Sequence, residues 1–151
     1  MDIHPLIKVI PRWQIKEVFS QDRCDIDGEF LGFTDIYENL SKIIPKYMTV
    51  IDFGCAYAPQ AYYFTKHFKY IGVDSEPMTQ FSTHNSEFFI MSIQNFIKNE
   101  KYIKEISFAI CSYVPDFDAQ ELVRNTFPNT FVYYPTNCFV PDFTNYPTMK
   151  G

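Results

Sequence analysis

The sequence predicts an α/β fold in which helices cover both faces of one mainly parallel sheet of about five strands, a three-layer sandwich. Short segments rich in β-branched and aromatic residues alternate along the chain with segments of helical character. One of the former, residues 106–111, is an almost continuous apolar run, as is typical of a strand buried on both faces of a parallel sheet. A length of 151 residues fits one domain with a proper core.

The expected strands are short and are bounded by loop or helix signals. They cover residues 49–53, 70–74, 88–91, 106–111 and 130–134. Because helical segments connect successive strands, right-handed crossovers should make these strands parallel.

The expected helices follow from apolar periodicity and from the residues at their ends. Thr34 is the predicted N-cap of a helix that runs to about Ile44 and ends before Pro45. Pro59 suits a first helical turn, where its missing N–H is not needed. Asp118 is the predicted N-cap of a later helix. The helices are expected at residues 13–20, 34–44, 59–68, 94–104 and 118–125.

The chain is expected to form a single domain over residues 1–151. Residues 34–134 hold the alternating strands and helices and form its core. Residues 1–33 precede the core as an N-terminal segment or lid. Residues 135–151 form a proline-rich tail without regular structure, which would leave residues 130–134 as an edge of the sheet.

Composition argues against several classes of function. Thirteen basic and eighteen acidic residues give a net charge of −5, so binding of nucleic acid through non-specific phosphate contacts is not expected. No apolar run approaches the roughly 20 residues that span a membrane, and no secretion signal is visible. The cysteines form no CxxC pair, so we expect reduced thiols in a cytoplasmic protein and no metal site; they are Cys24, Cys55, Cys111 and Cys138.

The turn after the first strand is the predicted ligand site, because ligands of open α/β sheets bind beyond the carboxyl ends of the strands. It has the sequence Asp52-Phe53-Gly54-Cys55-Ala56-Tyr57-Ala58. Small residues let the backbone pass close to a ligand, and the following helix offers free N–H donors.

Asp74 is the second feature of the predicted site. It ends the second strand, twenty positions after Gly54. A carboxylate at this distance typically accepts hydrogen bonds from ribose hydroxyls. Since it also repels phosphate, a nucleoside-type ligand is favoured over a bare phosphate.

These motifs resemble those of the class I S-adenosylmethionine-dependent methyltransferases. Residues 50–58 resemble the first motif of that family, an apolar strand followed by D/E-x-G-x-G-x-G, and residues 70–74 resemble the second. Residues 92–96 occupy the place of an adenine-contacting turn, and residues 110–115 that of the fourth-strand motif. The resemblance spans roughly residues 34–134 and implies a Rossmann-like sheet with S-adenosylmethionine as cofactor.

Family roles transfer to particular residues of this chain. Asp74 would hold the ribose, Ser92 would contact adenine through its backbone or hydroxyl, and Asp52 would support the methionine amino group. Ser112 and Tyr113 are the best-placed catalytic candidates. The resemblance implies cofactor contacts from Asp52, Phe53, Gly54, Cys55, Ala56, Tyr57, Asp74, Ser75, Ser92, Ile93, Cys111 and Ser112.

The chain departs from the family pattern in three places. Ala56 and Ala58 replace the second and third family glycines, and Ala56 would be strained if a positive φ were required. Residues 112–115 are not the Asn/Asp-Pro-Pro-Tyr of enzymes that methylate amino groups of nucleobases. The antiparallel hairpin that normally follows strand five is expected to be missing, and a homodimer through that strand is one way to cover its edge.

Methyl transfer to a small molecule or a protein is therefore the leading hypothesis. The first alternative is a catalytically inactive protein of this fold that serves as a binding or interaction module, because the glycines are eroded and no general base is evident. A nicotinamide-dependent oxidoreductase is less favoured, since a dinucleotide needs a second nucleotide-binding half. The turn also fits a βα unit that packs tightly without any ligand.

Overall fold

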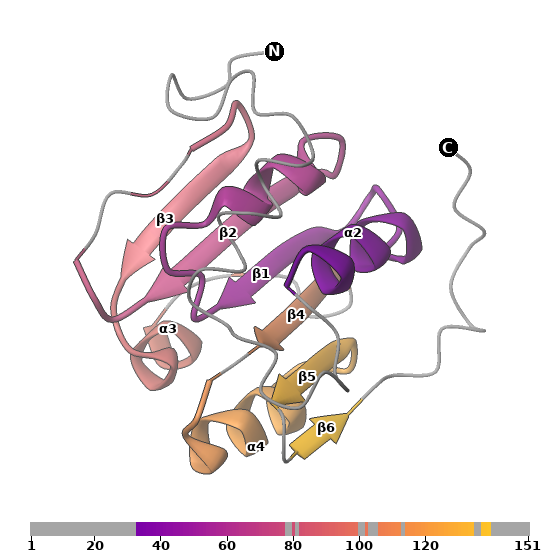
Figure 1. Cartoon of the computed structure of the whole chain (residues 1–151). Coiled ribbons are helices and arrows are strands. Elements are labelled where there is room, and N and C mark those ends of the chain that lie inside the picture. The colour runs from indigo at the N-terminus through magenta and orange to yellow at the C-terminus, as the bar shows by residue number, and fades with distance from the viewer. Residues whose placement is uncertain are drawn as a thin grey trace.

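The computed structural model describes residues 33–77, 80, 82–99, 102, 106–112, 114–134 and 137–139. The helix expected at residues 13–20 lies outside this part of the chain, as does the expected lid apart from its last residue. Figure 1 shows the described elements around one twisted sheet. Within the described residues, no helix is both long and apolar enough to cross a bilayer.

The sheet confirms the predicted α/β fold. Its strands are β1 (Thr49–Phe53), β2 (Lys69–Asp74), β3 (Ser86–Ile90), β4 (Ser107–Ser112), β5 (Thr130–Tyr134) and β6 (Asn137–Phe139). They lie in the order β3-β2-β1-β4-β5-β6, and β1 to β5 are parallel. All five predicted strands are present, and their ends differ from the prediction by at most two residues. This is the strand order of a doubly wound sheet.

Strand β6 corrects the expectation for the tail. It pairs antiparallel with β5, with Tyr134 opposite Asn137 and Val132 opposite Phe139. The prediction of no regular structure after residue 134 was therefore wrong, and at least one short antiparallel strand follows strand five. The strand is possible because it lies between Pro135 and Pro141, so that neither proline removes an N–H from its ladder. The edge of β5 that a homodimer would have used is occupied by β6.

Two helices lie on one face of the sheet, and each differs from its prediction. Helix α2 (Phe33–Ile43) begins one residue before Thr34, so Thr34 is not its N-cap. The segment η1 (Pro59–Phe64) has Pro59 in its first turn, as expected. It is a 3-10 helix, however, and it ends four residues before the predicted end at residue 68.

Two helices lie on the opposite face. Helix α3 (Ile93–Asn99) begins one residue before the predicted start. Helix α4 (Phe117–Thr126) is capped by Asp116, whose carboxylate accepts hydrogen bonds from the backbone of Asp118 and Ala119. Asp118 is therefore a first-turn residue and not the predicted N-cap.

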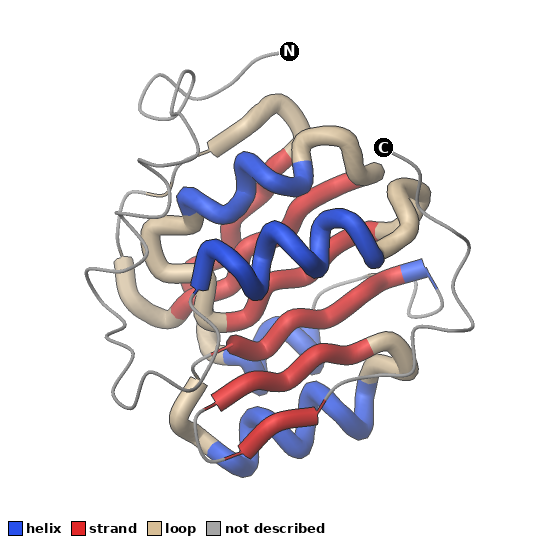
Figure 2. The backbone as a smooth tube through the Cα atoms, turned by 45° about the vertical axis from the view of Figure 1, so that its right-hand side comes forward, coloured by secondary structure: helices blue, strands red, loops and turns tan. Residues whose placement is uncertain are grey.

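The helices lie on both faces of the sheet and so form three layers with it (Figure 2). Two apolar clusters lie between these layers, one on each face of the sheet. On one face, Tyr37 and Leu40 of α2 pack with Phe64 of η1 over the sheet; on the other, Phe96 of α3 and Val123 of α4 cover it. Every residue of β1 and β4 is buried, as predicted for the central strands of a parallel sheet. Since the strand order reverses at β1, the carboxyl ends of β1 and β4 border the crevice in which ligands of such sheets bind.

Candidate functional site

The turn after β1 has a left-handed backbone at every second residue. The φ angles are +77° at Gly54, +52° at Ala56 and +59° at Ala58. These are the three positions at which the resembled family carries glycine. For an alanine the left-handed region costs about 1–2 kcal/mol, so this chain keeps the shape of a glycine-rich turn against local strain.

Strand β2 holds one side of this turn. The backbone N–H groups of Gly54 and Cys55 both donate to the carbonyl oxygen of Val73, at 2.7 and 3.2 Å. The N–H of Ala56 donates to Oδ2 of Asp74 at 2.9 Å. Oδ1 of Asp74 in turn accepts the N–H of Glu76 at 2.9 Å. The two features that the sequence singled out are thus joined by a direct hydrogen bond.

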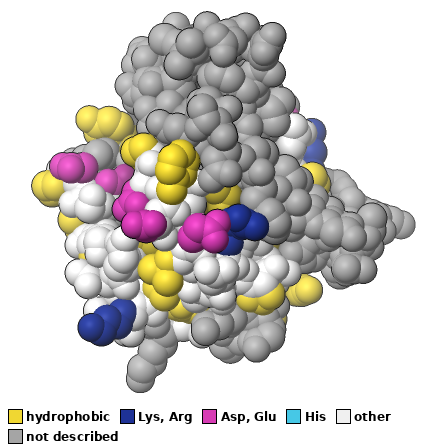
Figure 3. Space-filling model, turned by 90° about the horizontal axis from the view of Figure 1, so that it is seen from below, with side chains coloured by type: hydrophobic (Ala, Val, Ile, Leu, Met, Phe, Trp, Pro, Cys, Tyr) yellow, Lys and Arg dark blue, Asp and Glu magenta, His cyan; other side chains and the backbone are white. Residues whose placement is uncertain are grey.

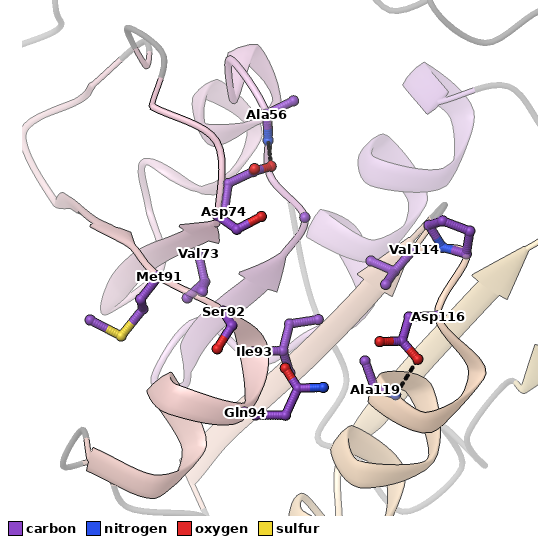
Figure 4. Close-up of a pocket in the computed structure, with 13 residues that line it drawn as sticks. Ala56, Val73, Asp74, Met91, Ser92, Ile93, Gln94, Val114, Asp116 and Ala119 are labelled. Atoms are coloured by element: carbon purple, nitrogen blue, oxygen red, sulfur yellow. Dashed lines mark hydrogen bonds between the residues drawn. The ribbon is translucent and has the colours of Figure 1, made fainter.

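A cavity of about 380 Å³ opens beside this turn, at the carboxyl ends of β1, β2 and β4 (Figure 4). Its described lining comes from the turn, the end of β2, the connection from β3 to α3 and the segment that leads into α4. The lining residues are Gly54, Ala56, Val73, Asp74, Ser75, Met91, Ser92, Ile93, Gln94, Val114, Pro115, Asp116 and Ala119.

Gly54 is required for the two sides of the cavity to approach each other. A Cβ at this position would lie 2.8 Å from Cγ2 of Val114, which is closer than real Cβ contacts. Val114 belongs to the segment after β4 that forms the opposite wall (Figure 4). Glycine is therefore favoured here both by the positive φ and by the space available.

At the starts of α3 and α4, the side chains of Ser92 and Asp116 accept hydrogen bonds from the backbone of their own helices. Oγ of Ser92 accepts the N–H of Asn95 at 3.1 Å. Oδ1 of Asp116 accepts the N–H groups of Asp118 and Ala119 at 3.0 and 3.2 Å. Helix N-termini often bind anions in α/β folds. At α4 this place is taken by the Asp116 carboxylate of the chain itself.

The cavity is acidic and partly apolar. Asp74 and Asp116 face it from two sides, and the described lining residues include no Lys, Arg or His. Figure 3, which views the molecule from below, shows acidic side chains near the middle of that face, with a basic side chain beside them and hydrophobic ones around them. Such a lining disfavours phosphate and other anions.

Asp52 lies behind the turn and not in the cavity. It is fully buried, and its carboxylate accepts hydrogen bonds from Tyr37 of α2 at 2.9 Å, Gln60 of η1 at 2.8 Å and Tyr70 of β2 at 2.5 Å. Burial raises the pKa of Asp52 to about 6, an effect that the three hydrogen bonds oppose. Burial and the nearby Asp52 carboxylate also raise the pKa of Tyr37 and of Tyr70 well above the usual value.

The structure divides the predicted cofactor contacts into two groups. Gly54, Ala56, Asp74, Ser75, Ser92 and Ile93 line the cavity. The remaining six are not among the lining residues: Tyr57 is half exposed, and Asp52, Phe53, Cys55, Cys111 and Ser112 are buried. Of the two catalytic candidates, Ser112 is 2% exposed and Tyr113 lies outside the described residues.

Several lining residues were not predicted from the sequence. Met91 was assigned to a strand without a role at the site, and Gln94 lies in the expected adenine-contacting turn of residues 92–96 but was not named as a contact. Asp116 was not among the predicted contacts, and its position a few residues after the fourth strand is the signal that could have indicated it. Val73 and Ala119 are apolar residues whose place at a cavity depends on the packing of neighbouring elements.

The described thiols are unreactive in character. Cys55 and Cys111 are free and buried. Burial raises the pKa of Cys111 to about 12 and raises the pKa of Cys55 further. In the described part of the chain, no group of three or more His, Cys, Asp or Glu residues is arranged to hold a metal ion.

No known protein family and no curated protein matches the sequence. Two solved structures are similar in chain path. A putative methyltransferase from Streptococcus mutans, solved in complex with SAH, has a TM-score of 0.47 and 17% identity over 65% of this chain and 70% of its own. A putative type II methyltransferase from Anaeromyxobacter dehalogenans has a TM-score of 0.49 and 14% identity over 65% of this chain. The match spans 44% of that second protein.

Proposed function

We propose that the cavity binds S-adenosylmethionine and that the protein transfers its methyl group to a small molecule or a protein. The observation that carries this proposal is the hydrogen bond between the backbone N–H of Ala56, in the left-handed turn, and the carboxylate of Asp74 at the end of β2. Ala56 and Asp74 meet at the mouth of a cavity whose volume of about 380 Å³ is that of a small-molecule site.

Asp74 retains the capacity to hold a ribose. A carboxylate offers about four acceptor positions. Two of them are taken by the N–H groups of Ala56 and Glu76, one on each oxygen. Each oxygen therefore keeps one lone pair for a hydroxyl, and two vicinal ribose hydroxyls present two such donors.

The rest of the cavity suits the remainder of the cofactor. Ile93, which is partly exposed, supplies apolar surface against which an adenine ring would pack. Because Gly54 has no side chain, the segment that contains Val114 can pack directly against the turn and close this side of the cavity.

When bound, the cofactor supplies an activated methyl group on a sulfonium. The protein then has to hold that methyl group in line with the acceptor and to keep water away. Asp74 and the turn perform the holding, and the segment that contains Val114 and Pro115 closes the opposite side. The acidic lining repels an anionic acceptor, which favours a neutral or cationic small molecule or side chain over nucleic acid.

The proposal is tested by calorimetric titration of the full chain with S-adenosylhomocysteine. Asp74→Ala removes the ribose acceptor and should weaken binding at least tenfold, or about 1.4 kcal/mol. Asp74→Asn keeps part of the acceptor capacity for the backbone N–H groups, so its affinity should lie between those of the wild type and of Asp74→Ala. Asp118→Ala is the matched control, because Asp118 is an exposed carboxylate outside the lining, and it should bind as the wild type does.

A wild-type protein that does not bind S-adenosylhomocysteine would contradict the proposal, and so would an Asp74→Ala variant with undiminished affinity. Binding without transfer is the second candidate function. It is favoured by Ser112, a predicted catalytic residue that is buried outside the cavity lining. Release of S-adenosylhomocysteine from S-adenosylmethionine on addition of acceptors separates the two functions.

A further inference from the structure

Asp52 has a role that its position in the motif does not suggest. Its side chain is 0% exposed, and its carboxylate is surrounded by donors from α2, β2 and η1 rather than by the cavity. Alternation along β1 explains this orientation. Ile51 and Phe53 pack on the face covered by α3 and α4, whereas Asp52 points to the face covered by α2. Asp52 can therefore influence a ligand only through another residue.

Gln60 is the residue that connects Asp52 to the turn. Its side chain is 4% exposed, and its Nε2 donates to Oδ2 of Asp52 at 2.8 Å and to the carbonyl oxygen of Cys55 at 3.0 Å. A side-chain amide has two N–H groups, so each acceptor receives one. The same carbonyl of Cys55 also accepts the N–H of Ala58 at 2.9 Å, which closes the turn.

The turn is thus clamped from two sides. On one side, β2 holds it through Val73 and Asp74, and on the other side Gln60 ties Cys55 to the buried carboxylate of Asp52. A glycine-rich turn reaches the left-handed region freely. Here two of the three left-handed residues are alanines, at about 1–2 kcal/mol each, so the surrounding contacts must hold the conformation.

We propose that Gln60 is a positioning residue: by bridging Asp52 and the carbonyl of Cys55, it keeps the Gly54–Ala58 turn in the shape that the cavity ligand needs. The proposal rests on the proposed function for the identity of that ligand. The clamp itself is a property of the free protein. In this chain a side-chain bridge does the work that two further glycines do in the resembled motif.

A matched pair of variants tests the clamp. Gln60→Met keeps the length and bulk of the side chain but removes both donors. Tyr70→Phe removes a different donor from the same oxygen of Asp52 and leaves the Cys55 carbonyl untouched. Both variants deprive the buried carboxylate of one hydrogen bond, so both should lower thermal stability, and Gln60→Met should lower it more because it also loses the bond to Cys55. They differ in that only Gln60→Met removes the hydrogen bond to the carbonyl oxygen of Cys55 in the turn.

The first readout is hydrogen exchange of the amides of residues 54–58 in the ligand-free full chain. We expect exchange to rise at least tenfold in Gln60→Met and to stay within about twofold of the wild type in Tyr70→Phe. The second readout is S-adenosylhomocysteine affinity, which should fall about tenfold in Gln60→Met and little in Tyr70→Phe. If either variant is poorly folded, both readouts are taken in sucrose, which strengthens burial.

Equal exchange in the two variants, or unchanged exchange in Gln60→Met, overturns the positioning role. A wild-type protein that fails to bind S-adenosylhomocysteine refutes the proposed function, while the exchange measurement still decides whether Gln60 holds the turn. If the wild type binds and both variants weaken binding alike, the effect belongs to the buried carboxylate and the role of Gln60 is refuted.

Discussion

The backbone N–H of Ala56 donates a 2.9 Å hydrogen bond to Oδ2 of Asp74, across eighteen positions of sequence. This bond places the turn after β1 and the end of β2 in one unit. A substitution at Asp74 should therefore alter the shape of the turn, and a change in the turn should alter the direction of the Asp74 carboxylate. The predictions below follow from this unit and from the buried carboxylate behind it.

Gly54→Ala should both destabilise the protein and impair the cavity. The positive φ of +77° and the 2.8 Å approach to Cγ2 of Val114 each disfavour a Cβ. We expect a loss of about 2 kcal/mol in the free energy of unfolding, measured with urea, together with weaker binding of S-adenosylhomocysteine.

Ala109→Val is the control for this prediction. Ala109 of β4 is 0% exposed and packs in the apolar cluster beneath α3 and α4, so two added methyl groups should also destabilise the fold. Ala109 does not line the cavity, however, and ligand affinity per folded molecule should be kept. Retained affinity in Gly54→Ala would refute the prediction.

Glycine should be favourable at Ala56 but not at Ala58. Both alanines are left-handed, and glycine removes a strain of about 1–2 kcal/mol but loses part of this gain to chain entropy. Ala58 is also 0% exposed, so deletion of its methyl group loses about 0.8 kcal/mol of burial. We expect Ala56→Gly to raise the free energy of unfolding by about 0.5 kcal/mol and Ala58→Gly to bring no gain. A destabilised Ala56→Gly protein would mean that the left-handed turn is not strained in solution.

The stability of the protein should fall as Asp52 ionises. The pKa of Asp52 is raised from 3.8 to about 6 by burial, so the folded state binds the proton more tightly than the unfolded state. The contribution is therefore fully present below pH 3.8 and is lost as the pH rises through about 6. Its size is on the order of 2 to 3 kcal/mol.

Urea unfolding of the wild type and of Asp52→Asn at several pH values between 4 and 7.5 measures this effect. Other titrating groups contribute equally to both proteins, so the difference between the two curves reports Asp52. The wild type should lose stability relative to the variant across this range. Parallel curves would show that Asp52 titrates normally.

The strands were predictable because each is a short apolar segment with a clear boundary. In β4 the almost continuous apolar run reflects burial on both faces of the sheet, so the sequence shows it directly. The ends of the helices were harder to predict from the sequence. The 3-10 character of η1 depends on hydrogen bonds such as that from the N–H of Ala61 to the carbonyl oxygen of Ala58, and no residue pattern distinguishes these from α-helical ones.

Strand β6 was missed because a segment of three residues shows little pattern and because prolines stand nearby in the sequence.

The candidate site was predictable where spacing alone fixes it. The distance from Gly54 to Asp74 reflects one strand-to-strand crossover, and this pair does meet at the cavity. The inward turn of Asp52 was not deduced, although alternation along β1 could have indicated it. Gln60 could not be found from the sequence, because its two acceptors are brought together only by the left-handed turn.

The antiparallel pairing of β6 with β5 bears on whether another chain can add a strand to this side of the sheet. An unpaired five-residue parallel strand would present a flat row of donors and acceptors, to which another chain could add. With Asn137–Phe139 in place, the outermost strand on that side is only three residues long. A protein truncated after Tyr134 would lose this cover, and its freshly opened border would be a template for aggregation.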